Sequence, residues 1–527
     1  MKLPPGVDET NFKKALQEFA TVVGDDWVFS KDEDVALYND AYSPFYGDPD
    51  QQRVASAAVA PATVEQVQQI VRIANKYRTP LFTISTGRNL GYGGSAPNYS
   101  GSIIVDLKRM NRIIEVNATD GYMIVEPGVS FLDVRRYFDE HGVDYVPSSP
   151  APGWGSPIGN ALEHGAGNVF IDNFSAVSGL EVVLASGEVL RTGRGALPNS
   201  KLWANYHYGF GPYIDGMFSQ SNFGIVTKAC FWIKPRWEVT QMFMVASFNE
   251  EDLDTMADAL KELRNHDVIN MFGMGCPIRE SANFRERLRV PNNPLVPEVR
   301  ALHRRRDGGS TAQWQALAAK AGMPAASVIG IIRGPASIVK AHLDYVQDFL
   351  AKRKTPGAFA PFPPDTAIKP PNIDFGMVAL QKMTKGHYFF SPAIQQTRED
   401  LLGINLLIRN IFLDAGEEAL LDEEGWWGAA PTSEKHMMVI MEWAVQDDKE
   451  KNHRMRELFL KVTKAAGERG WGEYRAPVAF HDNVMDQFSF NNHILRRFSE
   501  TIYDALDPNG ILSPGKSGIW PKHLRKA

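Results

Sequence analysis

A glycine-rich stretch, S-T-G-R-N-L-G-Y-G-G, could bind a phosphorylated ligand. It spans Ser85 to Gly94 and places four glycines within eight residues. Glycines let the backbone fold tightly and aim several N–H groups at one point, which suits a pyrophosphate. The order differs from the G-x-G-x-x-G of a Rossmann nucleotide loop. On these residues alone, a surface loop is the commoner explanation.

A single histidine stands at the head of an aromatic run, K-G-H-Y-F-F-S-P, from Lys385 to Pro392. One interpretation of His387 is a core histidine whose ring nitrogens are satisfied by neighbours. The other is that His387 is bonded to another group, since an imidazole nitrogen is a competent nucleophile. The stretch by itself leaves both open.

Three further segments are candidate binding loops: the glycine-rich GWGSPIGNALEHGAGN from Gly153 to Asn168, SQSNFGIVTKA at 219–229 with one glycine, and the glycine-rich GILSPGKSG near the end. The last formally satisfies the G-x-x-x-x-G-K-[ST] phosphate-loop pattern at Gly510–Ser517. We reject that interpretation because such a loop opens a helix, whereas Pro521 follows closely. Pro514 also removes one of the backbone donors that the loop would need.

The bulk composition is that of a soluble globular protein. The chain has 527 residues, 44% hydrophobic and 22% charged, with a net charge of −6. A nucleic-acid partner is not expected, because phosphate binding needs clustered Lys and Arg. The two cysteines form no CxxC motif or disulfide framework. Without a secretory signal or a long apolar stretch, we expect a cytoplasmic protein that does not engage a membrane.

The elements that position these motifs alternate between strand and helix over residues 55–130. Thr63, with Gln66 three residues later, predicts a helix start, and Val64, Val67, Ile70 and Val71 follow helical spacing. TPLFTIS, GSIIVDL and YMIVEPG read as strands, VSFLDVRRYFDEHG as a helix, and GLEVVLASGEVLRTG as a hairpin turning at Ser186-Gly187.

The composition and the pattern of predicted elements change near residue 236. A strand over KPRWEVTQMFMVASFN precedes a helix over EEDLDTMADALKELRNH, and residues 280–320 read as irregular. Residues 353–374 are expected to form a long surface loop. The HYFFSP strand, a helix over TREDLLGINLLIRNIF, the strand KHMMVIMEWAV and a helix over KNHRMRELFLKVTKAAGERG follow. These pairs predict a separate α+β cap, and from 471 onward we expect short strands and loops.

Together, these loops in this order resemble one family. STGRNLGYGG, VEPGVSF, GLEVVLASGEVLRTG, GFGPYIDGMFSQSNFGIVTK, WGEYR and DPNGILSPGKSGIWP look like the vanillyl-alcohol oxidase family of flavoproteins, in its 4-alkylphenol branch. The likeness covers nearly the whole chain and is densest in 55–235 and 471–521.

The resemblance implies an α+β, two-domain flavoprotein fold with FAD as cofactor. The FAD domain would comprise 1–236 and 471–527, with a cap domain over 237–470. Homo-oligomers, dimers or octamers, are common in the family. The residues expected to bind the cofactor are Ser85, Thr86, Gly87, Arg88, Asn89, Gly91, Tyr92, Gly93, Gly94, Gly159, Asn160, Gly224, Ile225, Val226, His387, Arg475 and Lys516.

In this family a His in a G-H-x-F-F-S-P context carries the flavin through its 8α-methyl carbon, and His387 matches by its flanking residues. In p-cresol methylhydroxylase-like members the bond goes instead to a Tyr further upstream. Here the corresponding text, around Phe375–Ala379, holds no Tyr. The resemblance therefore favours FAD linked covalently through His387. Such a link raises the flavin potential and favours hydride abstraction.

The resemblance also implies the substrate, a phenol with a para side chain that binds as phenolate. Hydride would leave the benzylic carbon for flavin N5, giving a p-quinone methide. Tyr92, Tyr474 and Arg475 match the residues that hold the phenolate, since two hydroxyls can donate and Arg keeps its charge. Without the family, Tyr92 would be a turn residue and Tyr474-Arg475 ordinary surface.

Asp172 keeps the spacing to Gly179 of a family Asp that acts as a base near flavin N5. The surrounding text departs from the family: R-G-V-G-Y-T-P-Y-G-D-H becomes H-G-A-G-N-V-F-I-D-N, one residue shorter. His164 stands at the family's Arg position, and we interpret it as a loop residue. Substrate size and the fate of the quinone methide are therefore open.

The strand KHMMVIMEW also departs from the family. Alternation puts Met437, Val439 and Met441 on one face and Met438, Ile440 and Glu442 on the other. Glu442 could face the substrate, but we interpret it as a surface carboxylate. Flexible Met side chains would suit a pocket for a bulky aromatic, with core packing as the default.

We consider three functions. The first is an oxidase that passes electrons to O2 and releases hydrogen peroxide. The second is a dehydrogenase of the same substrates that serves a c-type cytochrome; the chain itself carries no C-x-x-C-H haem site. The third is a flavin-binding partner subunit without turnover. The joint presence of Tyr92, Asp172, His387, Tyr474 and Arg475 argues against the third.

Overall fold

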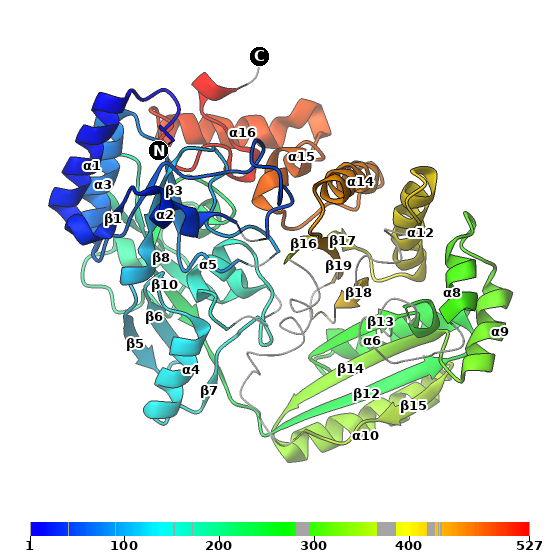
Figure 1. Cartoon of the computed structure of the whole chain (residues 1–527). Helices are drawn as coiled ribbons and strands as arrows, with labels where there is room; N and C mark the ends of the chain where they lie inside the picture. Colours follow the sequence, from blue (N-terminus) through cyan, green and yellow to red (C-terminus); the bar gives the residue numbers. More distant parts are fainter. Residues whose placement is uncertain are drawn as a thin grey trace.

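The computed structural model describes residues 2–40, 42–89, 91–150, 153–170, 172–280, 296–365, 386–418, 427–430, 432 and 435–525. Figure 1 shows the N-terminal sheets and the C-terminal helices gathered on one side, and the sheet that carries β12–β15 on the other. The architecture is α+β, with strands gathered into separate sheets. Among the described helices, none combines the length and apolar character that a membrane span requires.

The first sheet has the order β1-β2-β4-β3, and β4 pairs in parallel with both neighbours. Its elements are α1 (Glu9–Val23), β1 (Val28–Phe29), α2 (Asp32–Val35), β2 (Ala57–Val59), α3 (Val64–Tyr77), β3 (Leu81–Ile84) and β4 (Ile103–Asp106). The predicted start of α3 is confirmed, because the Thr63 hydroxyl accepts from the backbone N–H of Gln66 at 3.3 Å. Such a cap stabilises a helix by ~1 kcal/mol.

The C-terminal segment returns to this sheet. The backbone N–H of Leu81 donates to the carbonyl of Ile511 at 2.7 Å, and that of Ser513 donates to the carbonyl of Leu81 at 2.8 Å. Ile511 and Leu512 join Leu81 and the strands of the first sheet in one buried apolar cluster. The chain end is therefore part of the same structural unit as β3.

The second sheet is antiparallel, in the order β5-β6-β10-β8-β9. Its segment contains β5 (Ile113–Asn117), β6 (Tyr122–Val125), α4 (Phe131–Glu140), β7 (Tyr145–Val146), α5 (Pro157–Leu162), β8 (Val177–Val183), β9 (Val189–Arg191), β10 (Ile225–Trp232) and β11 (Lys234–Pro235). The β8–β9 hairpin is confirmed. Its turn uses Gly187 at φ +81°, a conformation that glycine adopts without strain.

The third sheet has the order β13-β14-β12-β15, and α6 and α10 pack on it. Its segment contains β12 (Val239–Ser247), α6 (Leu253–Asn265), β13 (Met271–Gly275), α8 (Val296–His303), α9 (Thr311–Ala321), β14 (Ala326–Gly334), α10 (Ala336–Arg353) and β15 (Ala358–Pro361).

The fourth sheet is centred on β19, which pairs with β16, β17 and β18. Its segment contains β16 (Gly386–Phe390), β17 (Ala393–Ile394), α12 (Arg398–Asp414), β18 (Trp427–Ala430), β19 (Met437–Val445) and α14 (Lys449–Gly467), followed by α15 (His481–Met485) and α16 (Phe490–Leu506). One buried apolar cluster joins the third and fourth sheets, so they share a core.

Three expectations from the sequence were wrong. Within 280–320, Thr311–Ala321 forms α9, which begins with a capping box between Ser310 and Gln313. Within the expected loop at 353–374, Ala358–Pro361 forms β15 as an edge strand on β12. After residue 471 the chain forms α16, whose entry turns through left-handed residues Asn491, Asn492 and His493. The domain boundaries at 236 and 470 stay a prediction.

Candidate active site

A cavity of about 480 Å³ is lined by residues from both halves of the chain, from Phe82 to Lys516. Most of the residues expected to bind the cofactor line it: Ser85, Thr86, Gly87, Arg88, Asn89, Tyr92, Gly93, Gly94, Gly159, Asn160, Gly224, Ile225, Val226, Arg475 and Lys516. Gly91 and His387 are not among the lining residues. Phe375–Ala379 lie outside the described residues.

The glycines of the loop are required by close packing. A Cβ at Gly93, where φ is +111°, would lie 2.5 Å from Cγ2 of Val478. A Cβ at Gly159, at the start of α5, would lie 2.4 Å from Oγ of Ser85. The tight backbone of 85–94 and the first turn of α5 therefore approach each other across the cavity. Backbone donors gathered in this way fit the pyrophosphate of a dinucleotide.

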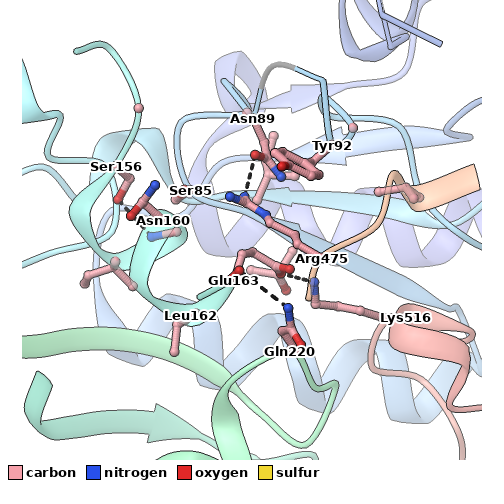
Figure 2. Close-up of a pocket in the computed structure, with 18 of the residues that line it drawn as sticks. Ser85, Asn89, Tyr92, Ser156, Asn160, Leu162, Glu163, Gln220, Arg475 and Lys516 are labelled. Carbon is pink, nitrogen blue, oxygen red and sulfur yellow. Dashed lines mark hydrogen bonds and ion pairs between the residues drawn. The ribbon is translucent and has the colours of Figure 1, made fainter. Parts of the chain in front are cut away.

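Tyr92, Tyr474 and Arg475 are brought together although Tyr92 is distant in sequence from the other two. The hydroxyl oxygens of Tyr92 and Tyr474 are 3.4 Å apart. The Arg475 guanidinium lies 4.4 Å from the centre of the Tyr92 ring and donates to Oδ1 of Asn89 at 2.5 Å. Figure 2 shows Arg475 reaching toward Asn89 beside Tyr92. The arrangement gathers two hydroxyls and one permanent cation in one cavity.

Tyr92 has a second partner that the sequence did not indicate. Its hydroxyl lies 2.7 Å from Oγ of Ser391, just after β16. Burial raises the pKa of Tyr92 well above its usual value, and Tyr474 adds to the shift while the charge of Arg475 opposes it. Tyr92 therefore stays protonated and can donate its hydroxyl hydrogen.

His387 is fully buried on β16, where it shares one side of the strand with Phe389. Its ring centre lies 5.0 Å from that of Tyr42 and 4.8 Å from that of Phe389. Its Nδ1 lies 3.6 Å from Oε1 of Glu442. His387 does not line the cavity, but Phe389 and Glu442 do. The covalent bond stays a prediction.

Glu442 is not a surface carboxylate, and that interpretation was wrong. The alternation along β19 holds: Met437, Val439 and Met441 enter the core, while Ile440 and Glu442 line the cavity. Glu442 pairs in register with Phe389 and is 1% exposed. The sequence gives the two faces of a strand, but not which face meets a cavity.

Asp172 lies outside the set of cavity-lining residues, with a side chain 37% exposed. It accepts from the backbone N–H of Phe174 at 2.9 Å, and its Oδ2 lies 3.1 Å from Nδ1 of His164. Nε2 of His164 lies 3.1 Å from Oγ of Ser219. His164 lies in the turn after α5, in agreement with its interpretation as a loop residue, and its ring joins the turn at Asp172 to Ser219.

Glu163 is a cavity-lining residue that the sequence did not reveal. Its carboxylate forms an ion pair with Lys516, and the two side chains are each 19% exposed. The side-chain amide of Gln220 donates to the carbonyl of Tyr474 at 2.8 Å and to that of Glu163 at 3.5 Å. Figure 2 shows Glu163, Gln220, Arg475 and Lys516 converging.

His481, another lining residue, makes stability depend on pH. Its Nδ1 accepts from the backbone N–H of Ser517 at 2.9 Å, so protonation would break that bond. Burial, and then the charge of Lys516, lower the pKa of His481 to about 3, while Glu163 opposes the shift.

Because an unfolded histidine titrates near pH 6.5, the unfolded chain binds the extra proton between about pH 6.5 and about pH 3. Stability must therefore fall as pH drops through this window. Relative to His481→Asn, whose amide oxygen can accept the same bond, the free energy of unfolding should decrease by roughly 2–3 kcal/mol between pH 7 and pH 4. Urea unfolding of both proteins at pH 7 and pH 4 measures this free energy. An equal change with pH in the parent and in His481→Asn would contradict the prediction.

Comparison with known proteins identifies the family of the chain. Residues 55–193 match the family model described as FAD binding domain. The flavoprotein subunit of 4-cresol dehydrogenase [hydroxylating] from Pseudomonas putida is 31% identical over 533 residues, covering 98% of this chain and 97% of that protein. The chain belongs to the vanillyl-alcohol oxidase family. Within it, the relative places the chain in the 4-alkylphenol branch.

Solved structures of this family share the whole architecture. The structure of p-cresol methylhydroxylase with substrate bound has a TM-score of 0.81 at 28% identity and covers 99% of both chains. That of 4-ethylphenol oxidase from Gulosibacter chungangensis, in complex with isoeugenol, has a TM-score of 0.80 at 31% identity, covering 99% of this chain and 100% of that one. The expected two-domain fold is thereby confirmed. The protein is an FAD-dependent oxidoreductase of the 4-alkylphenol-oxidising type.

Proposed function

We propose that this protein oxidises phenols that carry a para side chain, among them 4-alkylphenols, 4-hydroxybenzylic alcohols, allylphenols and lignin-derived aromatics. The observation that carries the proposal is the meeting of Tyr92, Tyr474 and Arg475 in one cavity with the glycine-rich loop. Two relatives that match over the full chain are named for 4-cresol and 4-ethylphenol.

The first task of the site is to bind the phenol as its anion. Tyr92 and Tyr474 can donate to the same oxygen, and Arg475 supplies a charge that does not titrate. In a largely buried site these donors are worth more than in water, because they are fixed before the reaction begins. Ionisation pushes electron density toward the para position and makes the benzylic carbon a better hydride donor. Loss of hydride leaves a p-quinone methide.

FAD would supply the hydride acceptor in this cavity. The residues that would hold it are the cavity-lining residues of the loop (85–89 and 92–94), the first turn of α5, residues 224–226, Ser513 and Lys516. We propose that it is attached covalently through His387, on the strength of the G-H-Y-F-F-S-P context. In that case Phe389 and Glu442, which contact His387 and line the cavity, orient the imidazole.

We assign to Asp172 the role of base toward the quinone methide or its attacking water. Its support is the spacing to Gly179 and its bond to His164, which fixes the carboxylate. The 480 Å³ cavity borders this region through Leu162, Glu163 and Ala166. The altered text at 164–174 would then govern whether water adds or a proton leaves the side chain.

We propose O2 as the electron acceptor, giving hydrogen peroxide, and a homo-oligomer as the working form. The histidine context supports the oxidase. The alternative is a dehydrogenase that passes electrons to a cytochrome c, favoured by the name of the Pseudomonas putida relative.

The test is to add 4-ethylphenol to the FAD-loaded protein without oxygen and follow the flavin absorbance. Bleaching is expected with 4-ethylphenol and not with 4-ethylanisole, its methyl ether, which cannot ionise. Absence of bleaching with any para-alkylphenol would overturn the proposal. On admitting air, recovery of colour with peroxide identifies the oxidase, and persistent bleaching identifies the dehydrogenase.

A further inference from the structure

The charges that line the cavity are unequal in number. Arg88, Arg475 and Lys516 are cations, whereas Glu163 and Glu442 are carboxylates. The side-chain partner of Arg475 is the neutral amide of Asn89, so this contact does not offset the charge of Arg475. The partner of Lys516 is the carboxylate of Glu163. Of these two cations, Lys516 therefore has a carboxylate partner, whereas Arg475 has a neutral one.

The ion pair between Glu163 and Lys516 is held in a largely buried place. Burial alone would raise the pKa of Glu163, but the charges of Lys516 and Arg475 outweigh it and hold the pKa below its usual value. Glu163 is therefore an anion at neutral pH. It compensates Lys516 directly and feels Arg475 as well.

The pair is connected to the oxygen-binding end of the site. Arg475 acts electrostatically on Glu163, and the Gln220 amide ties the backbone of Glu163 to that of Tyr474. Glu163 follows directly on α5, while Lys516 comes from the C-terminal segment. In Figure 2 both side chains approach Arg475.

We propose that Glu163 is a charge-compensating residue that neutralises Lys516 and thereby sets how strongly the Arg475 end of the cavity binds an anionic phenol. The inference rests on the proposed function, since it concerns the same site. Glu163 then limits the affinity for the phenolate that Arg475 provides. With Lys516 uncompensated, a second positive charge would act on the bound oxygen and hold substrate and product phenolates more tightly.

The direct probe is 4-nitrophenol, which has no benzylic hydrogen and absorbs differently as phenol and as phenolate. Titrated below its own pKa into the FAD-loaded protein, it reports both affinity and ionisation in the site. Glu163→Gln is expected to bind the phenolate about 3- to 10-fold more tightly than the parent, the size of one unit charge acting at partial screening. Glu163→Asp, which keeps the charge, is the matched control and should stay near the parent.

Lys516→Met provides the reverse change, measured on protein whose FAD content is matched to that of the parent, because Lys516 also lies in the proposed FAD site. It leaves Glu163 as an uncompensated anion near the phenolate and should weaken binding by a similar factor. The double variant Glu163→Gln/Lys516→Met should return toward the parent value, because both charges are removed together. This variant series also keeps the inference testable if Glu163→Gln fails to fold.

The outcomes separate the inference from the function on which it rests. If the parent does not ionise 4-nitrophenol on binding, the phenolate site itself is wrong. If the parent ionises it but Glu163→Gln and Lys516→Met bind it equally well, the charge-compensating role is overturned. 4-Nitroanisole, which cannot ionise, should bind all variants alike, and an equal change with this ether would also overturn it.

Discussion

Replacing Arg475 by methionine is expected to lower kcat/KM for 4-ethylphenol by about 10²- to 10³-fold, the loss seen when a preorganised anion donor is removed. Methionine keeps much of the volume of the side chain but removes the charge that stabilises the phenolate. Arg475 is 7% exposed, so little solvent reaches it to replace the charge. The pH optimum should rise, because the phenol must then ionise before it binds.

Two controls define this result. Asn89→Ala removes the neutral partner of Arg475 but keeps the cation, so its loss should be much smaller. Arg475→Lys keeps a charge without the planar fork and should fall between the two. A loss of less than about threefold in Arg475→Met, with an unchanged pH profile, would remove Arg475 from phenolate binding.

The second large effect concerns His387. In the parent protein, yellow colour should remain in the pellet after acid precipitation, because a covalent flavin survives unfolding. His387→Ala should release all of it to the supernatant. Tyr388→Phe is the matched control, since Tyr388 lies on the opposite side of β16 among the core aromatics and should leave the colour in the pellet.

Two results would contradict the bond. Colour retained in the pellet of His387→Ala would place the link elsewhere. Colour lost from the parent itself would make His387 a buried strand histidine, held by Tyr42, Phe389 and Glu442.

Elements with local signals could be predicted from the sequence. The start of α3 depends on Thr63 and Gln66, and the β8–β9 hairpin depends on Ser186-Gly187, both short-range features. The helix α9 was missed although Ser310 and Gln313 form a capping box, because the charged residues around 304–306 suggested an irregular region. The entry of α16 runs through Asn491, Asn492 and His493, residue types that adopt left-handed backbone more readily than most, but such residues do not predict the start of a helix.

The residues of the site also differ in whether the sequence signals them. Tyr92, Tyr474 and Arg475 could be named because their motifs resemble a family, and the structure places them together. The ion pair of Glu163 and Lys516 joins residues 353 positions apart, and no periodicity links them. The interpretation of Glu442 as a surface carboxylate was wrong because alternation assigns residues to the two faces of a strand without showing what each face contacts. Charge pairing across a cavity is a tertiary property.

The return of the C-terminal segment to β3 has a consequence for biosynthesis. The wall of the cavity is incomplete until Leu512, Ser513 and Lys516 have left the ribosome and paired beside Leu81. The glycine-rich loop emerges more than 400 residues earlier, well before its enclosing partners exist. We therefore expect the cavity to capture its cofactor only after residues 512–516 have been synthesised, and a stop codon placed before Leu512 to abolish loading while leaving most of the core residues in place.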